Sequence, residues 1–208
     1  MFIGLDISFR RTGIAVIDEH WKRIELTAVP GEVGDKSFQG IIRAVEIQSD
    51  LIMHVIRKHF VKDVPDELFI VIEEPVPNSQ FSSGLFALVS KVVFDIKKEV
   101  PLKGIWMLNP TYIGHLHKTR VYNKSDSVRM AGSLMNVLQQ QGFNVQKGRY
   151  SHDEADALLH LLRIFVKEYR GDIVLKEELL KIASNLGSSK EKYLRFHEEE
   201  VVNGKASA

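Results

Sequence analysis

The sequence contains no cysteine. Disulfide bonds and thiolate metal sites are therefore excluded, so any bound metal ion must use oxygen or imidazole ligands. The absence of disulfides also fits a reducing compartment, and we expect a cytoplasmic protein. No apolar run reaches the roughly 20 residues that a membrane-spanning helix needs, and the first residues do not follow a signal-peptide pattern. We therefore expect no membrane partner.

A strong excess of either charge is also missing. The chain has 28 Lys and Arg against 27 Asp and Glu, for a formal net charge of +1. Overall charge therefore does not indicate nucleic-acid binding, which would need a local basic surface. With 208 residues, 44% of them hydrophobic and 26% charged, the composition is that of a globular protein. This length accommodates one sizeable domain and a short extension.

The spacing of apolar residues predicts an α/β protein. An initial meander is followed by alternating helices and strands, which implies a mixed five-stranded sheet with helices on both faces. We expect one domain over residues 1–171 and a C-terminal extension over 172–208, partly helical and mobile toward its end. The predicted strands are 2–7, 13–18, 23–29, 68–72 and 104–108, with a short one at 143–145, and the helices are 41–60, 83–98, 125–141, one from 151 and one over 174–186.

Four acidic residues stand at the ends of these predicted core elements. Asp6 lies inside the first strand, and Glu73 lies where the strand 68–72 ends. Asp153 and Asp156 are three residues apart on the helix that begins at 151, so they share one face. If the first and fourth strands are neighbours and the last helix crosses them, the four carboxylates converge.

Converging carboxylates predict a particular chemistry. They repel one another, and divalent cations relieve this repulsion. Oxygen ligands suit Mg²⁺, for which Mn²⁺ can substitute. Two such ions about 3.5–4 Å apart activate a water molecule and stabilise the leaving oxygen of a phosphodiester. The four acids therefore predict two-metal hydrolysis of a phosphodiester.

Each acid alone also has a simpler explanation. Asp6 could accept a hydrogen bond from a backbone amide, and Glu73 with Glu74 could form a solvated turn. Asp153 near a helix N-terminus favours the helix dipole without any catalytic role. Asp156 is harder to explain in this way, because it lies further along an apolar helix between two alanines. The combination of the four is the stronger indication.

Three segments carrying these acids resemble, in order and spacing, the RuvC family of Holliday junction resolvases, including its phage-encoded members. They are residues 4–13 (GLDISFRRTG), 69–74 (FIVIEE) and 153–158 (DEADAL), and the resemblance covers roughly residues 2–166. It implies a ribonuclease H-like fold and a homodimer. It also implies a magnesium-dependent crossover junction endonuclease of DNA recombination and repair. Such an enzyme makes paired nicks in a four-way junction that leave a 5′-phosphate and a 3′-hydroxyl.

The resemblance also implies residue roles. It implies that four acids are catalytic and bind metal: Asp6, Glu73, Asp153 and Asp156. Glu74 is the alternative to Glu73, and His152 is a lesser candidate near Asp153. Lys124 would be a retained catalytic lysine. The chain departs from the family at Ile7-Ser8, where Pro-Gly is common, and at Gly114, where a lysine is common. Lys118 or His115 could replace that lysine. These departures concern sequence preference and substrate breadth more than hydrolysis.

A local basic excess follows the fifth strand. Six basic residues against one acid, Asp126, lie between 115 and 149, and they could line a phosphate-binding surface or form a solvated face. Arg10 and Arg11 lie beside the expected metal site, and Phe81 could insert into an opened junction or pack under its loop. Phe86, Val89, Val93 and Phe94 could form a dimer surface or a core face. The six basic residues are Lys118, Arg120, Lys124, Arg129, Lys147 and Arg149.

Three other functions remain open. The same acids would serve a nuclease that cuts flaps, forks and three-way DNA as well as four-way junctions. A strand, an aspartate and a turn containing Thr-Gly also open actin-like sugar and acyl kinases. Those kinases need a second phosphate-binding loop and a second domain, which are not evident in this sequence. A DNA-binding scaffold without catalytic activity is the third alternative.

Overall fold

The structure is a computed structural model that describes residues 1–31, 35–61, 64–75, 82–108, 124–146, 149–168, 175, 177, 179 and 191–195. Its strands are β1 (Phe2–Asp6), β2 (Arg11–Asp18), β3 (Arg23–Pro30), β4 (Leu68–Glu73), β5 (Leu102–Leu108), β6 (Asn144–Val145) and β7 (Glu191–Arg195). Its helices are α1 (Phe38–Phe60), α2 (Ser82–Glu99), α4 (Lys124–Gln140) and α5 (His152–Glu168).

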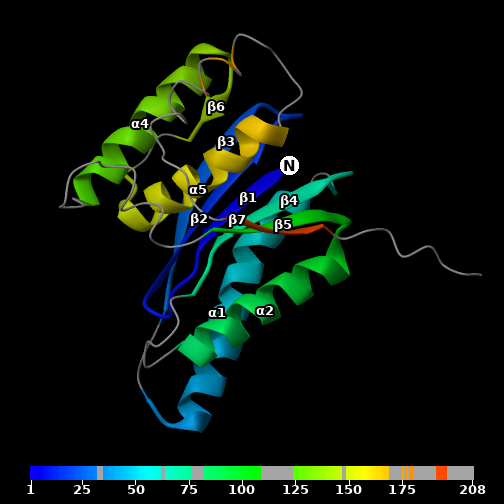
Figure 1. The fold of residues 1–208 in the computed structure, drawn as a ribbon, viewed down its shortest axis with the longest axis vertical. Helices are drawn as coiled ribbons and strands as arrows, with labels where there is room; N and C mark the ends of the chain where they lie inside the picture. Colours follow the sequence, from blue (N-terminus) through cyan, green and yellow to red (C-terminus); the bar gives the residue numbers. More distant parts are fainter. Residues whose placement is uncertain are drawn as a thin grey trace, which may run out of the picture.

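The strands form one mixed sheet in the order β6-β3-β2-β1-β4-β5-β7 (Figure 1). β1, β2 and β3 form an antiparallel meander, and β4 and β5 then continue the sheet parallel to β1. The first and fourth strands along the chain are therefore neighbours. This arrangement confirms the predicted mixed α/β fold, and it brings together the two strands that carry Asp6 and Glu73.

The described sheet has seven strands, two more than the predicted five: β6 is the short strand predicted at 143–145, and β7 was not predicted. β6 adds two residues in parallel beside β3, and β7 pairs antiparallel with β5. Both additions lie at sheet edges, where a strand has one neighbour and needs little apolar sequence. The charged segment 191–195 therefore has no strand pattern of its own. Leu175 and Leu179 are helical and buried in the core beside α5, so part of the predicted extension packs on the main domain.

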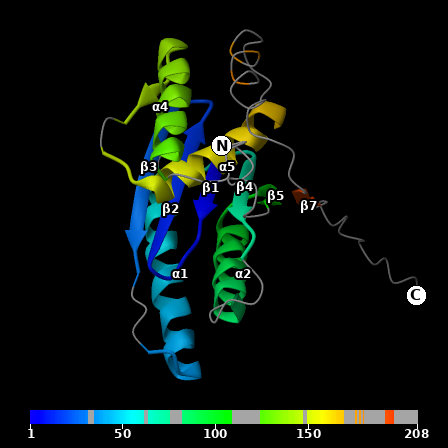
Figure 2. The same cartoon turned by 60° about the vertical axis from the view of Figure 1, so that its left-hand side comes forward.

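Helices cover both faces of the sheet, as predicted. In β1, Ile3 and Leu5 point into a core shared with α1 and α2. Phe2, on the opposite face, belongs to a second core formed with α4 and α5. Figures 1 and 2 show α1 and α2 side by side on one face and α5 crossing the other beneath α4. In the described part of the chain, no helix is long and apolar enough to cross a membrane.

Two glycines allow α5 to lie directly on the strands. A Cβ atom at Gly4 would lie 2.3 Å from the carbonyl oxygen of Ala157, and one at Gly13 would lie 2.1 Å from that of Asp153. Side chains at these positions would therefore collide with the helix backbone. The first turn of α5 lies over β2, and its next turns lie over β1, which sets the place of every side chain that the helix carries.

Candidate active site

Asp6 and Glu73 end two adjacent parallel strands. Leu5 pairs in register with Ile72, so the residues that follow them, Asp6 and Glu73, stand side by side. Side chains alternate along a strand. Asp6 is therefore on the same face as Gly4, and Glu73 on the same face as Val71, which is the face covered by α5. Both acids are partly buried.

The N-terminal half of α5 lies over this end of the sheet. The backbone of Asp153 contacts Gly13, which is the cross-strand partner of Asp6. Asp156 is buried, with 8% of its surface exposed. His160 is fully buried, and its Nε2 lies 3.0 Å from Oε2 of Glu73. Because residues three and four apart share a helix face, Asp153, Asp156 and His160 form a row along α5 that runs from β2 to β4.

His160 is a site residue that sequence reasoning missed. An ionised carboxylate only accepts hydrogen bonds, so Nε2 of His160 donates to Glu73. The bond holds the side chain of Glu73 against α5. The available signal was the spacing of His160, four residues after Asp156. An isolated histidine in an otherwise apolar helix gives no indication of its partner until the sheet is in place.

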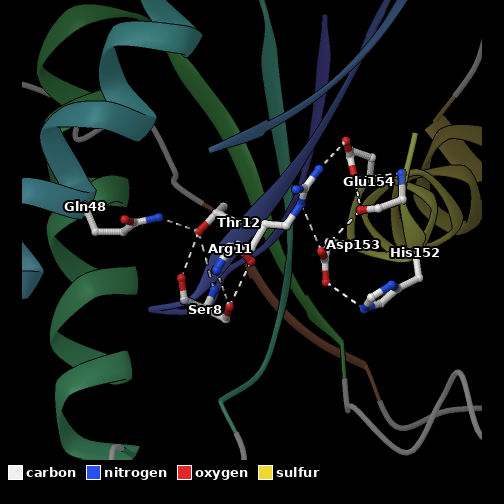
Figure 3. Close-up of polar contacts among 8 residues, drawn as sticks. Ser8, Arg11, Thr12, Gln48, His152, Asp153 and Glu154 are labelled. Atoms are coloured by element: carbon white, nitrogen blue, oxygen red, sulfur yellow. Dashed lines mark hydrogen bonds and ion pairs between the residues drawn. The ribbon is translucent and has the colours of Figure 1, made fainter. Parts of the chain in front are cut away.

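Arg11 contacts two acids in the first turn of α5. It extends from β2 toward the first turn of the helix (Figure 3). Its Nε lies 3.2 Å from Oδ2 of Asp153, and its Nη2 lies 3.2 Å from Oε1 of Glu154. The second oxygen of Asp153, Oδ1, lies 3.1 Å from Nε2 of His152. Both carboxylate oxygens of Asp153 therefore have partners within the chain.

Glu154 closes the N-terminus of α5. Its Oε2 accepts a 3.1 Å hydrogen bond from the backbone N–H of Ser151 and a second one from the Ser151 hydroxyl. Serine followed three residues later by glutamate is the capping-box sequence. Burial raises the pKa of Glu154, but the hydrogen bonds of Ser151 and the charge of Arg11 outweigh it, so its pKa is lowered overall. Glu154 therefore anchors both the helix end and Arg11.

Replacing Glu154 by glutamine should lower the free energy of unfolding by about 1 kcal/mol at neutral pH, because charge-assisted hydrogen bonds are lost. A carboxyl whose pKa is lowered by folding stabilises the protein above its unfolded pKa, for which the reference value is 4.5. That contribution disappears as the pH falls through the lower folded value. Urea unfolding at pH 7 and below pH 4 measures this, and an equal difference between the two proteins at both pH values would contradict it.

The turn that carries Arg11 is held from α1. The Ser8 hydroxyl donates to the carbonyl of Arg11 at 2.8 Å and accepts from its N–H at 3.1 Å. The Thr12 hydroxyl donates to the carbonyl of Ser8 at 3.1 Å and accepts from Nε2 of Gln48 at 3.2 Å. Thr12 and Gln48 are buried. The backbone at Arg11 is thus fixed, although 47% of its side chain is exposed. Ser8 supplies two of these bonds.

The acids do not form a ready metal site as they are arranged. Within the described residues, no three Asp, Glu or His side chains converge as ligands of one ion. The donors are chemically suited to a hard cation, since all four predicted ligands are carboxylates. Asp153 is instead bonded to Arg11 and His152, and Glu73 to His160. The fold brings the acids to one end of the sheet, and their role as metal ligands stays a prediction.

The expected DNA-contacting residues are only partly described. Arg10 is exposed beside Arg11 in the first turn, and Lys124 is the first residue of α4, with its side chain outside the described part. The other predictions that lie outside the described residues are Phe81, Gly114, His115, Lys118, Arg120 and Lys147.

The predicted dimer surface on α2 divides into two parts. Val89 is buried in the core shared with α1, and Val93 packs against that core. Phe86 and Phe94 are 40% and 59% exposed. Of these four residues, the two phenylalanines are therefore the exposed ones.

The chain is a mixed α/β protein with acidic residues gathered at one end of its sheet. No protein-family model matches it, and no curated protein sequence matches it.

Several solved structures are similar to it, and three of them are the following. Thermus thermophilus RuvC in complex with a Holliday junction substrate has 12% identity and a TM-score of 0.46, over 92% of this chain and 98% of that one. A second Thermus thermophilus RuvC structure has 15% identity and a TM-score of 0.44, over 92% and 99%. The yeast mitochondrial Holliday junction resolvase Ydc2 has 11% identity and a TM-score of 0.43, over 89% and 79%. At these values no functional residue is transferred from them.

Proposed function

We propose that this chain is a metal-dependent endonuclease that resolves four-way DNA junctions. One observation supports it above all: two neighbouring parallel strands end in Asp6 and Glu73, beneath the helix that carries Asp153 and Asp156. Acids that are far apart in sequence gather at one end of one sheet face. Burying several carboxylates together is costly unless cations compensate, and hydrolysis of a phosphodiester is the reaction that such a set serves best.

The proposed roles of individual residues rest on the sequence motifs and, for the acids, His160, Arg10 and Arg11, also on their positions in the fold. The four acids would hold Mg²⁺ or Mn²⁺, two ions per site, which supply an activated water and charge stabilisation. His160 would keep Glu73 oriented, as a second group hydrogen-bonded to a ligand commonly does. Lys124 would assist catalysis. Arg10, Arg11, Lys118 and Arg120 would contact DNA phosphates, and Phe81 would insert at the opened junction.

The choice of the four-way junction rests on the resemblance of the three acidic motifs to the RuvC family. Two symmetric nicks need two active sites, so the proposal includes a homodimer. In the proposed reaction, hydrolysis breaks the bond between the phosphorus and the 3′ oxygen, which leaves a 5′-phosphate and a 3′-hydroxyl. The proposed nuclease domain is residues 1–171, with residues 172–208 as an extension that contributes β7 to the sheet.

Cleavage of matched DNA substrates tests this function. Four-way, three-way and flap substrates with identical arm sequences are incubated with the purified protein, with Mg²⁺ and with a chelator. We expect paired symmetric nicks in the four-way junction, only with Mg²⁺, and products that ligase can seal.

Other outcomes identify the alternatives. Equal cutting of flaps and three-way DNA would indicate a broader nuclease. Junction binding without cutting under any metal condition would indicate a scaffold. Phosphotransfer from ATP would indicate a kinase.

A further inference from the structure

We propose that Arg11 is a built-in counter-cation that occupies Asp153 in the DNA-free protein and gives it up when a DNA phosphate binds Arg11. Metal and DNA would then bind cooperatively. The inference rests on the proposed function for its DNA part, whereas its metal part concerns only this chain. It accounts for one reason why the acids do not converge on one ion position in the described structure, namely that Asp153 is bonded to Arg11.

The contacts of Arg11 place it in direct competition with a metal ion. Its Nε is 3.2 Å from Oδ2 of Asp153, an oxygen that a metal ion would need. Its Nη2 also pairs with Glu154, so one guanidinium is shared by two carboxylates. The Asp153 side chain is 18% exposed and that of Arg11 47%, so water partly screens the ion pair. A divalent ion can bind Asp153 at this oxygen only after Arg11 moves away.

The backbone at Arg11 can stay in place while its side chain moves. Its backbone is held by Ser8 through two hydrogen bonds, and Gln48 supports this turn through Thr12. The side chain is 47% exposed and lies at the end of the sheet where the acids gather. Rotation of this side chain would carry the guanidinium from Asp153 toward solvent. A phosphate is a strong alternative partner there, because guanidinium and phosphate geometries match.

Cooperativity follows from these two competitions. DNA phosphate and Asp153 compete for Arg11, and the metal ion and Arg11 compete for Asp153. A bound phosphate therefore removes Arg11 from the metal ligand Asp153, and a bound metal ion removes Asp153 from Arg11, which is then available to phosphate. By thermodynamic linkage, DNA raises metal affinity by the same factor as metal raises DNA affinity. A purely structural ion pair would instead affect stability and leave metal affinity unchanged.

Calorimetric titration of Mg²⁺ into the DNA-free protein tests the competition. Arg11→Gln should bind Mg²⁺ about fivefold more tightly than the unmodified protein, a factor typical of a partly exposed ion pair. Arg57→Gln is the matched control, because Arg57 pairs with Glu99 at 2.6 Å and is similarly exposed, at 53%, on the opposite face. It should leave Mg²⁺ affinity unchanged. Unchanged or weaker binding by Arg11→Gln would overturn the proposal.

Two further variants make the test specific. Arg11→Lys keeps the charge but not the fork that reaches two carboxylates, so its Mg²⁺ affinity should be intermediate. It also provides a second measurement if thermal unfolding shows that Arg11→Gln is poorly folded. In the double variant Arg11→Gln/Asp6→Asn the increase in Mg²⁺ affinity should disappear. If the increase persists, the ion does not use Asp6, and a metal site shared by Asp6 and Asp153 is refuted.

The coupling is measured with DNA. Ca²⁺, another ion with oxygen ligands, should raise the affinity of the unmodified protein for a four-way junction about fivefold in fluorescence anisotropy, matching the expected competition. The increase should be smaller in Arg11→Gln, and an equal increase in both would refute the coupling. Failed cleavage of every substrate would remove the nuclease proposal but not the Mg²⁺ result, whereas unchanged Mg²⁺ affinity would remove only the role of Arg11.

Discussion

Cleavage of a four-way junction in Mg²⁺ should fall about a thousandfold when Asp6 is replaced by asparagine, which corresponds to roughly 4 kcal/mol of transition-state stabilisation. Asp6 stands at the end of β1 between Glu73 on β4 and the first turn of α5. Asparagine preserves the size of the side chain but removes its charge. Junction binding measured without divalent metal should change little, because phosphate contacts come from basic residues.

The other acids sharpen this test. Asp156→Asn and Glu73→Gln should also abolish cleavage, whereas Glu74→Gln should retain most of it, because Glu73 is the acid held against α5 by His160. Asp50→Asn is the control, because Asp50 is exposed on α1, which packs on the opposite face. Cleavage rates at saturating Mg²⁺ and junction affinities in anisotropy are compared for all variants. Full activity of Asp156→Asn would refute the site.

The second large effect is expected for Gly13→Ala. A Cβ atom at Gly13 would lie 2.1 Å from the carbonyl oxygen of Asp153 and 2.8 Å from the backbone nitrogen of Glu154. Because these neighbours are backbone atoms, the helix must move away from β2. We expect a loss of about 3 kcal/mol in the free energy of unfolding, at the upper end for overpacking. Cleavage should also be lost in the protein that remains folded, because α5 carries two of the acids.

Gly132→Ala is the matched control for this substitution. Its added Cβ would lie 3.2 Å from the Tyr150 hydroxyl, a side-chain atom, and its position in the middle of α4 favours alanine over glycine. Gly132→Ala should leave the free energy of unfolding unchanged or raise it. Urea unfolding measures both variants, and cleavage is assayed in parallel. If Gly13→Ala were as stable as the unmodified protein, the close approach of α5 to β2 would be wrong.

The local patterns of the sequence were sufficient for the elements and for the candidate acids. Alternating and helical spacing predicted β1–β5 and the four described helices, because each pattern reports which side of its own element is buried. The spacing of Asp153 and Asp156 placed them on one face of α5 before any fold was known. Elements without such a pattern were missed, as β7 shows: its pairing with β5 uses the backbone, and backbone groups are the same in every sequence.

The sequence alone determined which acids exist, on which elements they lie and that any metal site would use oxygen or imidazole ligands rather than thiolates. Only the tertiary structure decided that β1 lies beside β4, that α5 crosses them at the acidic end, and that Arg11 and His160 bind two of those carboxylates. The physical reason is the distance along the chain over which each effect acts. Burial periodicity acts within a few residues, whereas Arg11 meets Asp153, and His160 meets Glu73, through contacts between elements that are distant in the chain.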